Sequence, residues 1–362
     1  MENKRIRAIA FYLPQYYPTP ENDLWWEPGF TEWTNVKRAV PLFKGHCQPR
    51  IPAGLGYYDL RDPEIREKQA QMAAEAGIEG FCYWHYWFDG QELLGRVLDE
   101  VVASGKPDFP FCMCWANHSW YRKTWEPGKD DRLLIEQTYP GAEDYVRHFN
   151  ALLPAFKDKR YIKADGRLLF GIFDSDRIPD FPLMRQTWDA LAKEYGLPGF
   201  CFFGFVQGAH RLEGALKNGY DTIVYEHMTT VYKECRTPWK DFLCRTLHRP
   251  VTLRYSKYAG ETLDFLREHP ELTPCLIPDF DHSPRSGYRW IIMKDSTPQK
   301  WYELCRQCGK MLLGKDGSEK LLFLKAWNEW GEGNYLEPER RFGNGYLDSL
   351  AQALRDAGNQ AL

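Results

Sequence analysis

The sequence predicts a single (β/α)8 barrel, because apolar runs and helical patterns alternate in strict order, eight of each, along the 362 residues. No linker, repeat or low-complexity segment divides the chain, which indicates one domain over residues 1–362. A doubly wound open sheet is the alternative fold. It is disfavoured because no Gly-rich phosphate-binding turn follows the first apolar run.

The predicted strands are short and almost continuously apolar, as expected of parallel strands that helices cover. They span residues 6–13, 78–87, 109–116, 167–173, 200–206, 222–226, 274–280 and 320–327. The helical patterns that follow them lie near residues 62–76, 91–104, 142–156, 182–195, 208–218, 258–268, 297–312 and 346–357.

The ends of several helices carry recognisable start and stop signals. Asp62 is a typical N-cap and is followed by Pro63, which is favoured at the first helical position. Gly77, Gly105 and Gly196 follow three of the helical patterns, where glycine commonly ends a helix. These signals predict where the helices begin and end.

Two long segments interrupt the regular alternation, near residues 14–60 and 228–257. The first is rich in Pro, Trp, Tyr and Gly, and the second mixes basic and aromatic residues. Both follow strands, so both should rise from the carboxyl end of the barrel, where barrel active sites form. Loops of this length inside a compact domain are usually functional.

The composition excludes several classes of protein. The net charge is −3 and no basic stripe is present, which argues against nucleic acid as a partner. No run of about 18 apolar residues is present, so no membrane span is expected. The short charged start leads directly into a strand, which predicts a cytoplasmic protein, or an exported one if a leader has been removed. The oligomeric state stays open.

Cysteine and histidine spacing gives no sign of a metal or a cofactor. The ten cysteines are scattered, and Cys305 and Cys308 form a single C-x-x-C without a second pair. Histidines stand at several predicted strand ends, but none belongs to a short ligand motif such as H-E-x-x-H. We therefore expect no metal and no cofactor.

The stretch that gives most information about function follows the last predicted strand. It contains Glu329 and Glu332, flanked by Trp327 and Trp330. Indole faces stack on sugar rings, and a pair of carboxyl groups can move the protons of glycosidic bond cleavage. A glutamate pair with this spacing is more often a solvated helix face. Here Glu329 directly follows a strand, so we predict that Glu329 and Glu332 are catalytic.

Residues near the other strand ends and in the first long segment predict a cleft for a neutral polyol. They are mainly amides, aromatics, histidines and carboxylates, with few of the cations that phosphate or nucleotide binding requires. The expected substrate contacts are Tyr12, Gln15, Trp33, Tyr83, His85, Trp87, Trp115, Asn117, His118, Glu226, Asp281, Arg285, Trp327 and Asn328.

Six aromatic-rich strings carry a resemblance to a known family: FYLPQY at 11–16, NDLWW at 22–26, GFTEWTNV at 29–36, GFCYWHYWF at 80–88, CWAN at 114–117 and WNEWGEG at 327–333. Over nearly the whole chain the sequence resembles the WbsX family. That family is labelled as glycosyltransferases of surface-polysaccharide gene clusters and is related to glycoside hydrolase family 99.

The resemblance implies a barrel with its cleft at the carboxyl face and a retaining mechanism assisted by the substrate. Carried over, Glu329 helps the sugar 2-hydroxyl displace the leaving group through a 1,2-anhydro intermediate. Glu332 then protonates the departing oxygen and later acts as base. For that role we expect a raised pKa at Glu332, from burial and from the charge of Glu329.

Two motifs depart from the family pattern. Relatives usually carry an acidic residue after Trp-Ala-Asn, where this chain has His118 followed by Ser119. Where many relatives read Trp-Asp-Asn-Thr-Pro-Arg, this chain reads Phe-Asp-His-Ser-Pro-Arg at 280–285, which keeps Asp281 and Arg285. Both departures lie at the predicted cleft, so the sugar or its substituents can differ from those of the relatives.

Three functional hypotheses follow. The leading one is a retaining, endo-acting glycoside hydrolase that cleaves a complex polysaccharide or oligosaccharide. The second is a glycosyltransferase that builds a surface polysaccharide such as lipopolysaccharide O-antigen or capsule. The barrel topology, the paired glutamates and the absence of a D-x-D motif combined with a nucleotide-sugar loop favour the first, whereas the lack of a leader favours the second. The third is a carbohydrate-binding protein without catalysis. The sugar, its linkage and endo or exo action stay open.

Overall fold

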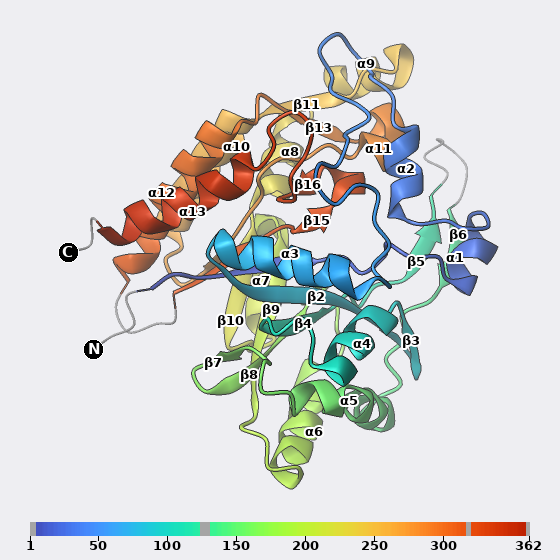
Figure 1. Cartoon of the computed structure of the whole chain (residues 1–362), viewed down its shortest axis with the longest axis vertical. Coiled ribbons are helices and arrows are strands. Elements are labelled where there is room, and N and C mark those ends of the chain that lie inside the picture. Colours follow the sequence, from blue (N-terminus) through green and yellow to red (C-terminus); the bar gives the residue numbers. More distant parts are fainter. Residues whose placement is uncertain (1–4, 124–130, 316–319, 360–362) are drawn as a thin grey trace.

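The computed structural model describes residues 5–123, 131–315 and 320–359. Eight parallel strands close into a barrel, in which β1 pairs with both β2 and β14 (Figure 1). The ring order follows the chain: β1 (Arg7–Tyr12), β2 (Ile78–Phe88), β4 (Phe111–Trp115), β8 (Arg167–Ile172), β9 (Phe200–Gln207), β10 (Thr222–Glu226), β12 (Thr273–Leu276) and β14 (Leu321–Leu324). The predicted (β/α)8 barrel is confirmed.

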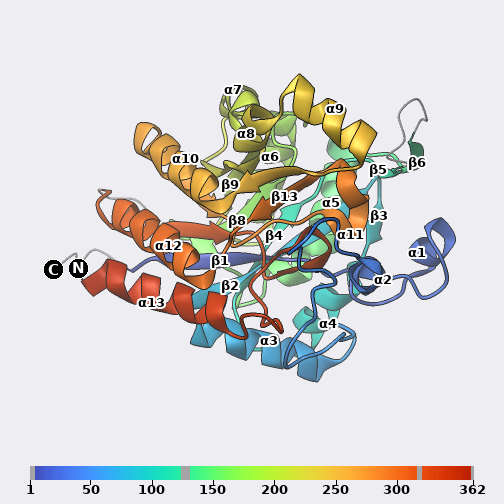
Figure 2. The ribbon, with the colours of Figure 1, turned by 90° about the horizontal axis from the view of Figure 1, so that it is seen from above.

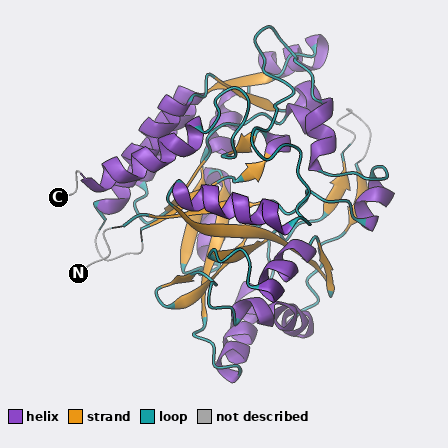
Figure 3. Ribbon diagram, in the orientation of Figure 1, coloured by secondary structure: helices purple, strands orange, loops and turns teal. Residues whose placement is uncertain are grey.

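Helices surround these strands on the outside (Figure 2, Figure 3). In chain order they are α3 (Pro63–Glu75), α4 (Arg96–Ser104), α5 (Ala142–Phe156), α6 (Phe181–Glu194), α7 (Leu212–Lys217), α10 (Tyr255–Glu268), α12 (Pro298–Leu313) and α13 (Gly345–Asn359). The largest differences from the predicted ranges have simple causes. Residues 91–93 form β3 (Gln91–Leu93), antiparallel to β2, and residues 209–211 form a 3-10 turn before α7.

The helix ends follow the predicted capping chemistry. The Asp62 side chain accepts a hydrogen bond from the backbone N–H of Glu64, and Pro63 opens α3. Gly105 ends α4 with φ of 70°, a left-handed conformation that glycine adopts without a steric penalty. Local sequence therefore fixes these helix boundaries before any packing is considered.

Aromatic side chains fill the barrel interior. The Phe11 and Trp84 rings stack at 4.3 Å, and Phe11 meets Phe205 edge-on at 5.2 Å. Because side chains alternate along a strand, the neighbour of Phe11 points outward, and the Tyr12 hydroxyl donates to Oε1 of Gln69 on α3 at 2.7 Å. This alternation decides which strand residues can reach the carboxyl end of the barrel interior.

The two long segments contain structure of their own. Residues 14–60 include α1 (Pro20–Trp25) and α2 (Glu32–Arg38). Residues 228–257 include α8 (Met228–Cys235), α9 (Pro238–Leu247) and β11 (Val251–Arg254), which pairs with β13 (Ile291–Lys294). The short helix α11 (Ser283–Ser286) and the pair β5 (Trp120–Arg122) and β6 (Arg132–Ile135) complete this region. Figure 1 and Figure 2 show α1, α2, α9, α11 and β5–β6 on the side away from the two termini.

No helix within residues 5–123, 131–315 and 320–359 is both long enough and apolar enough to cross a bilayer.

Candidate active site

The turn after β14 carries the two predicted catalytic glutamates. Glu329 lies in β15 (Asn328–Glu329), and Glu332 ends a 3-10 turn, η3 (Trp330–Glu332), before β16 (Asn334–Tyr335). Trp330 anchors the turn, because its Nε1–H donates to Oε2 of Glu337 at 2.6 Å and its ring stacks on Tyr335 at 3.7 Å. Buried hydrogen-bonding and aromatic contacts therefore hold the turn in place.

Two glycines let this turn approach its neighbours closely. A Cβ atom at position 331 would overlap Oε1 of Glu32 and lie 2.9 Å from Nε of Arg285. Gly333 has φ of 64°, and a Cβ atom there would lie 2.8 Å from the backbone nitrogen of Asp281. Both positions require glycine for the turn to keep this conformation.

Two cations bind Glu332. Nη1 of Arg285 lies 2.6 Å from Oε1 of Glu332, and Nζ of Lys325 lies 3.2 Å from Oε2. Burial works to raise the pKa of Glu332, but the charges of Lys325 and Arg285 outweigh it and hold the pKa well below its usual value. The expected raised pKa at Glu332 is therefore wrong, because the prediction counted the neighbouring acid and not these two cations.

The raised pKa belongs to Glu329 instead. Burial, followed by the charge of Glu332, raises the pKa of Glu329 to about 7. Its Oε1 accepts a hydrogen bond from Nε1 of Trp84 at 2.7 Å, and its carboxyl group interacts with that of Glu332. Of the two carboxyl groups, Glu329 is therefore the one that takes up a proton more readily.

The carboxyl pair lies in the wall of a cavity of about 530 Å³ at the carboxyl end of the barrel. Its wall combines apolar faces with polar groups, the mixture that sugar rings require. The apolar part consists of Leu13, Trp26, Phe30, Trp84, Tyr86, Ala116, Trp120, Tyr121, Leu134 and Phe173. The polar part consists of Gln15, Asn22, Glu32, Asn35, His118, Ser119, Lys123, His282, Arg285, Lys325, Glu329 and Glu332.

The structure brings some of the predicted site residues to this cavity and keeps others away from it. Those in the wall are Gln15, His118, Arg285, Glu329 and Glu332. The others are buried outside the wall: Tyr12, Trp33, Tyr83, His85, Trp87, Trp115, Asn117, Glu226, Asp281, Trp327 and Asn328. For these residues the expected substrate contact does not match the geometry, and strand alternation explains several of the differences.

Strand β2 shows the effect of alternation directly. Trp84 and Tyr86 line the cavity, whereas the residues between and after them point toward the helices. His85 shares a hydrogen bond of 2.8 Å with Nε2 of His148, and Nε1 of Trp87 donates to Oδ2 of Asp144 at 3.1 Å, both on α5. The prediction identified the correct strand, but it assigned the substrate contacts to the face of that strand that points away from the cavity.

Several of the remaining residues hold the loops at the carboxyl end. The Asn328 amide donates to the carbonyl of Leu13 at 3.0 Å and accepts from its N–H at 2.8 Å. Asn117 accepts from the N–H of Asp174 at 2.7 Å. Trp33 donates from Nε1 to the carbonyl of Tyr58 at 2.8 Å. These side chains position the loops and do not face the cavity.

Asp281 is also a positioning residue. Its Oδ2 accepts hydrogen bonds from Nε2 of His46 at 2.8 Å and from Nε2 of Gln48 at 2.6 Å. Its backbone N–H donates to the carbonyl of Glu332 at 2.7 Å. Burial opposes the charge of Asp281, but His46 and Arg50 hold the pKa of this carboxyl well below its usual value.

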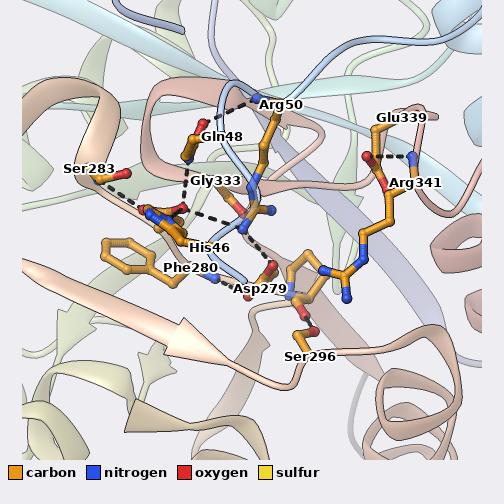
Figure 4. A network of polar contacts seen from close by, with 12 residues as sticks. His46, Gln48, Arg50, Asp279, Phe280, Ser283, Ser296, Gly333, Glu339 and Arg341 are labelled. Carbon is orange, nitrogen blue, oxygen red and sulfur yellow. Dashed lines mark hydrogen bonds and ion pairs between the residues drawn. The ribbon is translucent and has the colours of Figure 1, made fainter. Parts of the chain in front are cut away.

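The same network reaches the next residue of the turn. Figure 4 shows His46, Gln48 and Arg50, from the long segment 14–60, pointing into one polar cluster with Asp279. Nη1 of Arg50 donates to the carbonyl of Gly333 at 3.3 Å, and Nη2 of Arg50 lies 2.8 Å from Oδ2 of Asp279. The long segment therefore supports the turn that presents Glu332.

Sequence reasoning missed several residues of the wall, although some gave a signal. Lys325 is a lone cation at the end of an apolar strand, a position that rarely holds lysine without a partner. Glu32 lies inside the GFTEWTNV string but was not among the predicted site residues. Trp84 and Tyr86 differ from the predicted residues by one position. Among the described residues, no group of three or more His, Cys, Asp or Glu side chains is arranged to hold a metal ion.

Solved structures show the same fold. The GH99 endo-alpha-mannosidase from Bacteroides thetaiotaomicron matches with a TM-score of 0.56 and 16% identity, over 100% of this chain and 99% of that chain. A structure described as a glycoside hydrolase-like protein matches with a TM-score of 0.61 and 14% identity, over 98% of this chain and 95% of that one. The fold is therefore a (β/α)8 barrel like that of the GH99 endo-alpha-mannosidase.

The chain belongs to the family described as Glycosyltransferase WbsX, which matches residues 8–350. The resemblance read from the sequence is therefore confirmed. A relative named Uncharacterized protein WxcX, from Xanthomonas campestris pv. campestris, is 33% identical over 367 residues, covering 98% of this chain and 50% of the relative. A second strain of the same organism gives the same values. The chain spans about half the length of the curated relatives it matches.

Proposed function

We propose that this protein is a retaining glycoside hydrolase that cleaves within a complex polysaccharide or oligosaccharide, with Glu329 and Glu332 as its catalytic residues. The observation that carries this proposal is a pair of carboxyl groups, Glu329 with a raised pKa and Glu332 bound by Arg285 and Lys325, in the wall of a cavity lined by indole and phenol rings. Carboxyl pairs in such surroundings perform the proton transfers of glycosidic bond cleavage.

In the first step Glu329, as a carboxylate, takes the proton of the sugar 2-hydroxyl while that oxygen attacks C1. The bond from C1 to the leaving oxygen breaks, and Glu332 protonates that oxygen, which leaves a 1,2-anhydro sugar. In the second step Glu332 takes a proton from a water that attacks C1. The C1–O2 bond breaks, and Glu329 returns its proton to O2. Two inversions at C1 give net retention.

The first step requires a proton on Glu332, whereas in the free protein the pKa of Glu329 is the higher of the two. A 2-hydroxyl that donates a hydrogen bond to Glu329 stabilises its carboxylate and lowers its pKa. The proton can then pass from Glu329 to Glu332. The number of protons on the pair is the same before and after the step, so Arg285 and Lys325 face no change in net charge.

Glycosyl transfer from a nucleotide sugar is the second candidate, and the description of the family favours it. The cations of the wall, within the described residues, are poorly suited to a diphosphate because each already binds a carboxylate. Arg285 and Lys325 bind Glu332, and Lys123 binds Asp131 at 2.6 Å. A diphosphate would have to displace these carboxylates.

The experiment that separates the two candidates is a screen of bacterial and plant oligosaccharides, with product stereochemistry read by NMR, beside calorimetric titration with UDP- and GDP-sugars. Hydrolysis with retention supports the proposal. Inverted products, or nucleotide-sugar binding that depends on the cavity residues, would overturn it. Binding of oligosaccharides without product at any pH would identify a non-catalytic binding protein.

Substitutions then assign the roles of the two acids. Glu332→Gln should abolish turnover of unactivated glycosides and spare activated aryl glycosides, whose leaving groups need no proton. Glu329→Gln should lose both activities and still bind sugar. Glu303→Gln, on the outer helix α12, is the matched control. Equal losses on both substrates for Glu332→Gln would contradict its role as the acid.

A further inference from the structure

Helix α9, in the long segment 228–257, presents large apolar side chains to solvent. Trp239 is 66% exposed, Phe242 53% and Leu247 58%, and the Trp239 and Phe242 rings stack on each other at 5.6 Å. No residue of α9 is buried. Single exposed apolar residues are ordinary on protein surfaces, but three on one ten-residue helix form a patch that calls for a partner.

The segment around this helix is strongly cationic. Residues 233–257 contain seven lysines and arginines and two acidic residues, in a chain whose overall net charge is −3. Both acids are engaged, because Arg236 binds Asp241 at 2.6 Å and Lys257 lies 3.6 Å from Glu234. Arg245 and Arg249 are exposed beside the apolar side chains.

The helix is fixed to the barrel in a way that keeps this face outward. Thr237 caps its start by accepting from the N–H of Lys240, and Pro238 opens it. Nζ of Lys240 donates to the carbonyl of Cys235 at 2.8 Å, and Sγ of Cys244 lies 3.3 Å from the carbonyl of Tyr288. The exposed rings are therefore not held in place by burial, and they do not stabilise the fold.

We propose that α9 docks this protein on an anionic lipid surface, with Trp239, Phe242 and Leu247 inserted at the level of the headgroups. Indole and phenyl rings favour that region, and neighbouring lysines and arginines are attracted by anionic lipids. A second copy of the chain fits less well. A two-fold interface through α9 would place two cationic segments against each other.

The position of α9 gives the docking a consequence for the cavity. Figure 1 and Figure 2 show α9 on the same side of the barrel as α2 and α11, which supply Glu32 and Arg285 to the cavity wall. A protein bound through α9 would hold its cavity near the lipid surface, within reach of glycans attached to it. The docking itself does not depend on the proposed hydrolysis.

The test is co-sedimentation of the 362-residue chain with vesicles of phosphatidylcholine alone or mixed with phosphatidylglycerol. We expect binding to the mixed vesicles that weakens at high salt, because ions screen the attraction. The double variant Trp239→Ala with Phe242→Ala should bind at least about tenfold more weakly, since it removes two buried rings from the lipid contact. The triple variant Lys240→Glu, Arg245→Glu and Arg249→Glu should also lose binding.

Matched controls make the same kinds of substitution away from α9, so that an effect specific to α9 can be recognised. Leu216→Ala removes an apolar side chain that is 51% exposed on α7, and Lys159→Glu with Lys193→Glu changes exposed charges elsewhere. These variants should bind vesicles like the original chain, and circular dichroism should show that all variants are folded. Three outcomes would overturn the proposal: no binding to mixed vesicles, unchanged binding by the aromatic variant, or a preference for nucleic acid or an acidic peptide over vesicles.

Discussion

The Nη1 atom of Arg285 lies 2.6 Å from Oε1 of Glu332, and Nε of the same guanidinium lies 2.9 Å from Oε1 of Glu32. One arginine therefore joins two carboxylates that come from distant parts of the chain. Burial opposes the charge of Arg285, but the charges of Glu32 and Glu332 outweigh it and raise the pKa of this guanidinium above its usual value. This bridge, together with Lys325, favours the ionised form of Glu332 against the effect of its burial.

Substitution of the bridge should destabilise the protein. Arg285→Gln leaves Glu32, which is 2% exposed, as a buried charge without its cation, and we expect a loss of about 3–5 kcal/mol in the free energy of unfolding. Urea unfolding measures it. The double variant Glu32→Gln with Arg285→Gln should be more stable than the single variant, because it removes the uncompensated charge. A double variant less stable than Arg285→Gln would contradict this account.

The hydrogen bond from Trp84 to Glu329 should tune the pKa of Glu329. Trp84→Phe removes a donor to the carboxylate form, so the pKa of Glu329 should rise further above about 7. Carbon-13 NMR of the carboxyl groups measures this shift without a substrate, and the alkaline limb of the activity profile should move in the same direction. Trp120→Phe is the control, because Trp120 lines the same cavity. An unchanged Glu329 titration in Trp84→Phe would contradict the prediction.

A third prediction concerns stability against pH. Burial raises the pKa of Glu226 from 4.5 to about 7, so its folded form retains a proton that the unfolded chain releases. The stabilisation is complete below about 4.5 and is lost as the pH rises through about 7, up to about 3 kcal/mol. Glu226→Gln should flatten the pH dependence of urea unfolding in this window. Glu213→Gln, at an exposed position, should not. Identical slopes for Glu226→Gln and the original chain would contradict the prediction.

The close approach at Gly331 should tolerate no side chain. In Gly331→Ala the new Cβ would overlap Glu32 and press on Arg285, so the turn must move or the bridge must break. We expect a loss of several kcal/mol in stability, at least about 3, together with loss of activity. Gly358→Ala, where a Cβ meets nothing within 4 Å, is the matched control. Thermal unfolding measures both, and equal melting temperatures would contradict the prediction.

The sequence was sufficient to predict the barrel because its information is local. Each strand is a nearly continuous apolar run, and several helices begin or end with recognised caps, so strand order followed from counting. The two glutamates were predicted for the same reason, since the turn after the last strand must open at the carboxyl end. These features need no knowledge of contacts between distant residues.

The wall of the cavity could not be predicted to the same degree. Its composition depends on which face each strand residue presents, and a shift of one residue exchanges Trp84 and Tyr86 for His85 and Trp87. The ionisation of the pair depends on Arg285, which lies in a separate segment, and on Lys325, which precedes Glu332 by 7 residues. A single sequence gives residue types and their spacing along the chain. The direction of a pKa shift depends on the distances between charged groups in the folded protein, which a single sequence does not give.

The bridge formed by Arg285 also bears on how such barrels diversify. Glu32 belongs to the segment after the first strand, Arg285 to the one after the seventh, and Glu332 to the turn after the eighth. Loops exchanged between related proteins would carry one end of this bridge without the other. Such chimaeras would have a different acidity at the position of Glu332, so the three loops should be grafted as a matched set.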